Sequence, residues 1–361
     1  TDPATPGRRW LAGIATVESI AAQNLTDTTL ESSSLALSIN RPDSSGALVN
    51  FAASPVSIAT AAADSITLNT ASSEGSHAAA AGTVSGVIAG FADASGSFKI
   101  KRTVTASVAR LHVGATNLQA FVGNQAGTDS AKGVQISSGT LGMIVVAGTS
   151  GQPARYAVTA SGQAGTRGLS DLTLSGTLEL QAQRFGAAID ETISVGSGTV
   201  RVRHDDAANS TRVTGYTTLG TPIADLTGNF TAESTGTSPT RRLLLAASGI
   251  TGFVGNNRGT VTTADDSGIQ FTNGNLVAVI NPNGTWAIDA SGSAGVTGIT
   301  GVALTGTFAA TKNTTGTDVN ESFSVGGTTR TLAVPKDASS FAGTATFSAE
   351  NSVFLTGTIA V

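Results

Sequence analysis

The feature of this sequence that most constrains its fold is an internal repeat with a period of about 130 residues. Segments of the last two-thirds of the chain return in the same order, which indicates one structural unit used more than once. Three pairs share an offset of 130: YAVTASGQAG (156–165) with WAIDASGSAG (286–295), LTLSGTLEL (172–180) with VALTGTFAA (302–310), and DETISVG (190–196) with NESFSVG (320–326). Two pairs have offsets between 132 and 135: LQAFVGN (118–124) with ITGFVGN (250–256), and GVQISSGTL (133–141) with GIQFTNGNL (268–276).

A third and partial copy lies at the start of the chain. FADASGSFKI (91–100) matches IADLTGNFTA (223–232), and both match VFLTGTIAV (353–361). We therefore expect three parts, which are a partial unit over residues 1–96 and complete units over 97–229 and 230–361. Because the sequence begins inside a unit and stops on a strand, we expect it to be an excerpt of a longer protein.

Within a unit, apolar and polar residues alternate with a period of two. Val302, Leu304 and Phe308 fall on one face, and Ala303 and Thr305 on the other, which is the pattern of a strand with one buried face. Charged residues make up only 12% of the chain, so long helices would lack the side chains that favour their solvated face. The sequence predicts an all-β protein.

Turn residues and glycines favour a particular kind of all-β architecture. Gly196-Ser197 and Gly326-Gly327 are hairpin signals, and Asn281–Gly284 is a turn signal, so some neighbouring strands are antiparallel. Gly176 and Gly306 recur inside strands and indicate close backbone approach between layers. We expect an extended repetitive β-rod, resembling a β-solenoid or β-roll, with antiparallel hairpins. Tandem β-sandwich domains are the alternative.

Composition narrows the possible partners and the compartment. The net charge is −4 without a basic cluster, which gives no basis for nucleic-acid binding. No window approaches 18 apolar residues, so we expect no membrane span. The chain has no Cys, little Lys, and abundant Thr, Ser and Gly, a composition that suits a secreted bacterial protein located extracellularly or at the cell surface.

Catalytic motifs are missing from the sequence. No G-x-S-x-G elbow occurs, and the three histidines, His77, His112 and His204, are not spaced for a metal or a catalytic pair. The acidic neighbours of His204 lie in a stretch whose composition is typical of a polar loop. We therefore predict no enzyme, no catalytic residue and no cofactor-binding residue.

Calcium is the one candidate cofactor, because calcium prefers oxygen ligands from acidic loops. Solvated turn carboxylates are the competing interpretation, since no known calcium-binding loop motif is present. The candidate ligands are Asp190, Glu191, Asp265, Asp266, Asp318 and Glu321, of which Glu191 and Glu321 are repeat equivalents.

The recurring text FVG, GIQ-x-x-x-G-x-L, YA-or-WA-x-x-ASG, LTLSGT and DETISVG resembles the tandem repeats of very large bacterial surface or secreted proteins, of the giant adhesin and extracellular matrix type. The resemblance covers most of residues 97–361 and implies a spacer, adhesive or matrix role. It carries over no catalytic residue, and the calcium-binding nonapeptides of many such adhesins are missing here.

We expect a non-catalytic structural or adhesive segment that forms a stalk, filament or matrix by stacking of β repeats. Its expected partners are further copies, associating end to end or side by side, and cell-surface glycans. The alternative is a polysaccharide-binding or polysaccharide-cleaving β-helix such as a phage fibre, and an autotransporter passenger is a third option.

Overall fold

The computed structural model describes most of the chain and contains strands almost exclusively. The described residues are 7–21, 28–88, 92–105, 108–148, 152–205, 207, 209–236, 239–256, 266–349 and 353–360. Within them, the single helical element is the 3₁₀ turn η1 (Ser72–Glu74). The predicted all-β class is confirmed.

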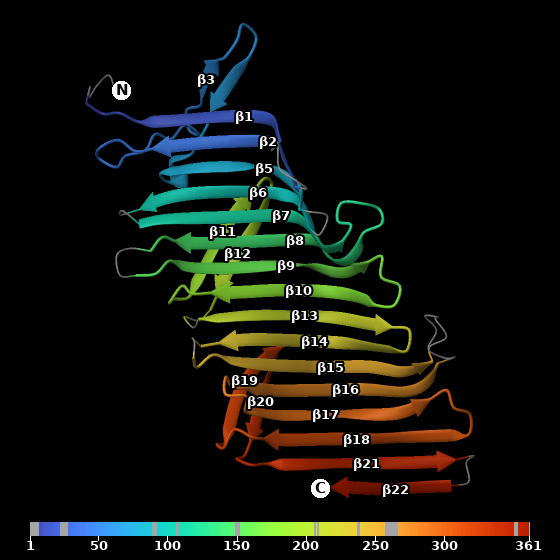
Figure 1. The fold of residues 1–361 in the computed structure, drawn as a ribbon. Helices are drawn as coiled ribbons and strands as arrows, with labels where there is room; N and C mark the ends of the chain where they lie inside the picture. Colours follow the sequence, from blue (N-terminus) through green and yellow to red (C-terminus); the bar gives the residue numbers. More distant parts are fainter. Residues whose placement is uncertain are drawn as a thin grey trace. The chain divides into compact units, whose positions relative to one another are not determined.

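Sixteen of the described strands belong to one antiparallel sheet (Figure 1). In sheet order they are β1 (Leu11–Ala21), β2 (Thr28–Arg41), β5 (His77–Ile88), β6 (Ala92–Thr105), β7 (Val108–Asn124), β8 (Lys132–Val146), β9 (Arg155–Arg167), β10 (Thr173–Gln183), β13 (Ser210–Thr221), β14 (Ala224–Thr235), β15 (Arg242–Asn256), β16 (Ser267–Ile280), β17 (Trp286–Thr297), β18 (Val302–Asn313), β21 (Ser339–Ala349) and β22 (Val353–Ala360).

Three two-stranded hairpins interrupt this order, each inserted between two strands that are neighbours in the sheet. They are β3 (Val56–Ala59) with β4 (Ser65–Leu68), β11 (Ile189–Val195) with β12 (Gly198–His204), and β19 (Val319–Val325) with β20 (Thr328–Val334). Six sheet strands therefore separate one hairpin from the next. The repeat-equivalent sequences lie on equivalent strands, for example 156–165 on β9 and 286–295 on β17.

The expected antiparallel hairpins are confirmed, but the strand order is not that of a β-solenoid. In stacked coils, a strand pairs in parallel with the strand one coil later, whereas each strand here pairs antiparallel with the next sheet strand. Short turns, such as the two residues between Thr221 and Ala224, leave no length for a coil. Tandem β-sandwiches are not observed either, because the second layer over the described sheet consists of hairpins.

The chain divides into two compact units, each of which is described alone. Unit 1 comprises residues 1–131, 135–162 and 183–207, and unit 2 comprises residues 132–134, 163–182 and 208–361.

In unit 1, hairpin β11–β12 folds back over β7, β8 and β9. Its apolar side chains face inward at every second position, as the alternation of buried and exposed residues along both strands requires. Gly114 on β7 makes room for this layer, because a Cβ there would lie 2.5 Å from Cγ2 of Val195. The buried cluster consists of Ile144, Val146, Ala157, Phe185, Ile189, Ile193, Val195, Val200 and Val202.

In unit 2, hairpin β19–β20 packs in the same way, and it contacts β14 to β18. Phe323 and Leu332 point from the two strands of the hairpin into the sheet, and Leu332 is 0% exposed. The buried cluster consists of Leu244, Ala246, Val277, Val279, Ala287, Phe323, Val325, Leu332 and Val334. The hairpins β11–β12 and β19–β20 thus each cover a small apolar core. The sheet face beyond the edge of each hairpin is not covered by that hairpin.

Candidate functional site

An arginine–glutamate pair ties each large hairpin to its sheet. In unit 1, Nη2 of Arg110 on β7 donates to Oε1 of Glu191 on β11 over 2.8 Å. In unit 2, Nη1 of Arg242 on β15 donates to Oε1 of Glu321 on β19 over 2.5 Å. Both pairs occupy the same place in the repeat. The carboxylates of the two glutamates that are calcium candidates are therefore each paired with an arginine. This ion pair fixes the hairpin on the sheet.

Two other calcium candidates also have protein partners. Asp190 accepts two hydrogen bonds from Arg201 across the β11–β12 hairpin, at 2.6 and 2.5 Å, and these bonds hold the pKa of Asp190 below its usual value. Asp318 accepts the backbone N–H of Lys336 over 2.7 Å.

Asp266 lies in a different environment in unit 2. It is buried, and its Oδ1 has no hydrogen-bond partner among the described residues. Desolvation and the nearby charge of Asp266 raise the pKa of Asp225. Asp265 lies outside the described residues. Across the described ranges, no three His, Asp or Glu side chains are grouped so that they could hold a metal ion.

The histidines are engaged within unit 1. Nδ1 of His77 lies 2.8 Å from the carbonyl oxygen of Gly75, and Nε2 of His204 lies 3.1 Å from the carbonyl oxygen of Val158. His112 differs, because its Nε2 lies 3.1 Å from Oε2 of Glu191 while its Nδ1 is buried without a partner in the described part of the chain.

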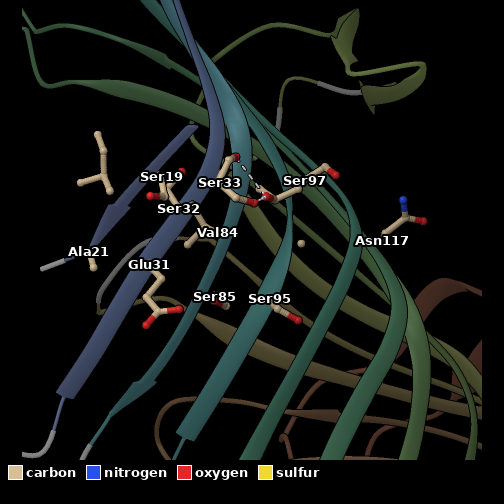
Figure 2. A pocket seen from close by; sticks show the side chains of 13 residues that line it. Ser19, Ala21, Glu31, Ser32, Ser33, Val84, Ser85, Ser95, Ser97 and Asn117 are labelled. Carbon is tan, nitrogen blue, oxygen red and sulfur yellow. Dashed lines mark hydrogen bonds between the residues drawn. The ribbon is translucent and has the colours of Figure 1, made fainter. Parts of the chain in front are cut away.

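A hollow of about 610 Å³ lies over strands β1, β2, β5 and β6 of unit 1 (Figure 2). Its centre is a row of hydroxyl side chains that face one another across these strands, which are Ser19, Ser33, Thr83 and Ser97. The hydroxyls of Ser33 and Thr83 are hydrogen-bonded to each other. Glu31 is the single carboxylate of the lining, so the hollow offers hydroxyls to a neutral polar ligand.

A second cavity in unit 1, of about 430 Å³, has a basic lining. Lys99 and Lys101 of β6, two residues apart on one face, enter it beside His112 of β7. The remaining lining residues are Glu74, Thr103, Thr192, Ile193 and Ser194. The sequence does not reveal this cavity, because its lining comes from η1, β6, β7 and β11, which are far apart along the chain.

Comparison with known proteins gave no match: no protein-family model matches the chain, and neither a curated protein nor a solved structure is similar to it. Among the described residues, no helix is long and apolar enough to cross a membrane.

Proposed function

We propose that this chain is a non-catalytic structural or adhesive segment of an extracellular bacterial protein, which builds a stalk, filament or matrix by adding β repeats. The observation that carries the proposal is the module itself. Two copies share a hairpin lid, an apolar core beneath it and an arginine–glutamate pair at the same positions. Repeat arrays gain their stability from contacts between neighbouring repeats, so a module of this kind is suited to extension by further copies.

The outer edge of β22 supports extension by strand pairing. Gly357 is the repeat equivalent of Gly228 on β14, where a Cβ would lie 3.1 Å from Cα of Ile250 on the neighbouring strand. At Gly357 a Cβ would meet no atom within 4 Å. Leu355 is 63% exposed, against 37% for its equivalent Leu226. Because β22 repeats the sequence of β14, and β14 pairs with β15, β22 has the sequence of a strand that accepts a further strand of the β15 kind.

Sedimentation velocity over a range of protein concentrations tests the proposal. The chain is expected to associate as its concentration rises, and Leu355→Lys should weaken the association, because a lysine on an edge opposes strand addition. The matched control is Ile223→Lys, which changes an equally exposed aliphatic residue in the turn between β13 and β14. A chain that stays monomeric up to its solubility limit, or equal effects of the two variants, contradicts the proposal.

The extracellular or cell-surface location belongs to the same proposal. Low charge, hydroxyl-rich faces and the absence of Cys suit a chain that works in an oxidising medium outside the cell. Labelling of intact producing cells with an antibody against the chain is the direct measurement. Labelling only after the cells are lysed argues against this location.

A polysaccharide-binding role is the second candidate, and the serine-lined hollow of Figure 2 favours it. Polysaccharide cleavage would need two carboxylates over one groove. The two unit 1 cavities described above each have one carboxylate in their lining, Glu31 or Glu74. A glycan array probed with the chain separates this role from a purely structural one.

A further inference from the structure

The basic cavity of unit 1 contains two lysines on the sheet face under a hairpin. Lys101 lies directly opposite His112 in the β6–β7 pairing, and Lys99 lies opposite Gly114, so both lysines are on the face that carries hairpin β11–β12. The outer residues of the hairpin, Thr192 and Ser194, complete the lining with hydroxyl groups. Six of the residues that line this space of about 430 Å³ carry N–H or O–H groups, which are Lys99, Lys101, Thr103, His112, Thr192 and Ser194.

The charges around the cavity leave a positive surplus. Arg110 and His112 share Glu191, and Nζ of Lys101 lies 3.1 Å from Oε2 of Glu74. Lys99 forms no ion pair with any described residue. Three permanent cations (Lys99, Lys101 and Arg110) thus face two carboxylates, a net charge of +1 before any proton on His112 is counted.

At the equivalent position, unit 2 has a cavity of about 300 Å³ that is lined by Thr231 and Ser324 in place of Lys99 and Ser194. In unit 2, strand pairing places Thr231 opposite Ala246 and Glu233 opposite Leu244. Thr231 therefore corresponds to Lys99 of unit 1, Glu233 to Lys101, and Leu244 to His112. Thr231 donates its hydroxyl to the carbonyl of Ser324 over 3.0 Å, and Glu233 accepts from Arg212 over 2.9 Å. A hairpin therefore packs on this sheet without any lysine, and the lysines of unit 1 are additional to the architecture.

We propose that this cavity binds an oxyanion, either as a free ion or as the acid group of an acidic polysaccharide. Lys99 supplies an ammonium group that has no ion-pair partner. The ammonium of Lys101 has three N–H groups, so it donates one to Glu74 and another to the ligand. Thr192 and Ser194 add neutral hydrogen bonds.

Isothermal titration calorimetry on the full chain tests the site, with sodium sulfate, a sulfated polysaccharide, a polyuronate and neutral dextran as separate probes. One oxyanion site per chain, weakened by added salt, is expected, and dextran should not bind there. Binding of sulfate alone identifies a free ion as the ligand, and binding of an acidic polymer without sulfate identifies the polysaccharide. Either result supports the site when it depends on Lys99.

Lys99→Thr places in unit 1 the residue that unit 2 has, and it should weaken binding about tenfold or more, as expected for loss of a charged hydrogen-bond donor. Lys336→Thr makes the same charge change on an exposed side chain of unit 2 and should leave affinity unchanged. Circular dichroism and thermal melts check that both variants fold. Equal affinities of the two variants, or no binding of any anionic probe, overturn the proposal. The strand-addition proposal is unaffected by that result, because it depends on the edge of β22 and is tested separately by sedimentation velocity.

Discussion

Truncating Leu332 should show whether hairpin β19–β20 is part of the cooperative core of unit 2. The side chain is 0% exposed and packs in the cluster with Val277, Val279 and Phe323. Leu332→Ala removes three buried carbon atoms, worth about 2.4 kcal/mol at roughly 0.8 kcal/mol each. The cavity left under the thin hairpin layer raises the expected loss in unfolding free energy to about 3–4 kcal/mol.

The two tryptophans of the chain allow the loss to be assigned to a unit. Trp286 lies in unit 2, beside the buried Ala287, and Trp10 lies in unit 1, so a Trp10→Phe background reports unit 2 by fluorescence during urea unfolding. Thr331→Ala is the control, because Thr331 precedes Leu332 on the exposed face of β20, and its effect should stay within about 0.5 kcal/mol. If Leu332→Ala is no more destabilising than this control, the hairpin is not part of the folded core.

Three further changes have expected results. Glu321→Gln breaks a partly exposed ion pair with Arg242, so it should lower the unfolding free energy of unit 2, measured by urea unfolding, by about 0.5–1 kcal/mol. No loss would mean that the pair does not fix the hairpin. Gly114→Ala should cost about 1–3 kcal/mol in thermal unfolding of unit 1, because the new methyl group meets Val195; an unchanged melting temperature contradicts this packing. Hydrogen bonds from Ser45 and Arg8 lower the pKa of Asp43, so Asp43→Asn should destabilise unit 1 at pH 6, and the difference from the parent should shrink as the pH falls below about 4, where an unfolded Asp protonates. A pH-independent difference in urea midpoints contradicts that assignment.

Much of the strand pattern could be predicted from local sequence. Alternation placed strands on both sides of the Gly326-Gly327 turn and of the Asn281–Gly284 turn, and the structure has a turn at each place. Alternation could not show which strands leave the sheet, because the hairpin strand β19 and the sheet strand β18 both alternate apolar and polar residues. The structure buries the apolar face of β19 but leaves Val302 and Leu304 of β18 exposed.

The glycines inside strands were interpreted only in part correctly. Gly306 was expected to mark close approach between layers, but a Cβ there would meet the carbonyl oxygen of Thr344 on the adjacent strand of the same sheet. Gly114 and Gly142 are the glycines that admit the second layer. Sequence reasoning also missed Arg110 and Arg242 as partners of the repeated glutamates. The two arginines occupy equivalent places in the repeat, which indicates a shared role, although each ion pair joins residues about 80 positions apart.

The two units provide an internal comparison that separates residues of the fold from residues of a site. Where both units have the same chemistry, as in the arginine–glutamate pairs, the shared requirement is the packing of a hairpin on a sheet. Where they differ at one register position, the residue of one unit is not required for packing a hairpin on the sheet of the other. Lys99 against Thr231, and His112 against Leu244, are differences of this second kind. The hairpin of unit 2 packs with Thr231 and Glu233 at the places of Lys99 and Lys101, so the positive charge of the unit 1 cavity belongs to a site and not to the packing of the hairpin.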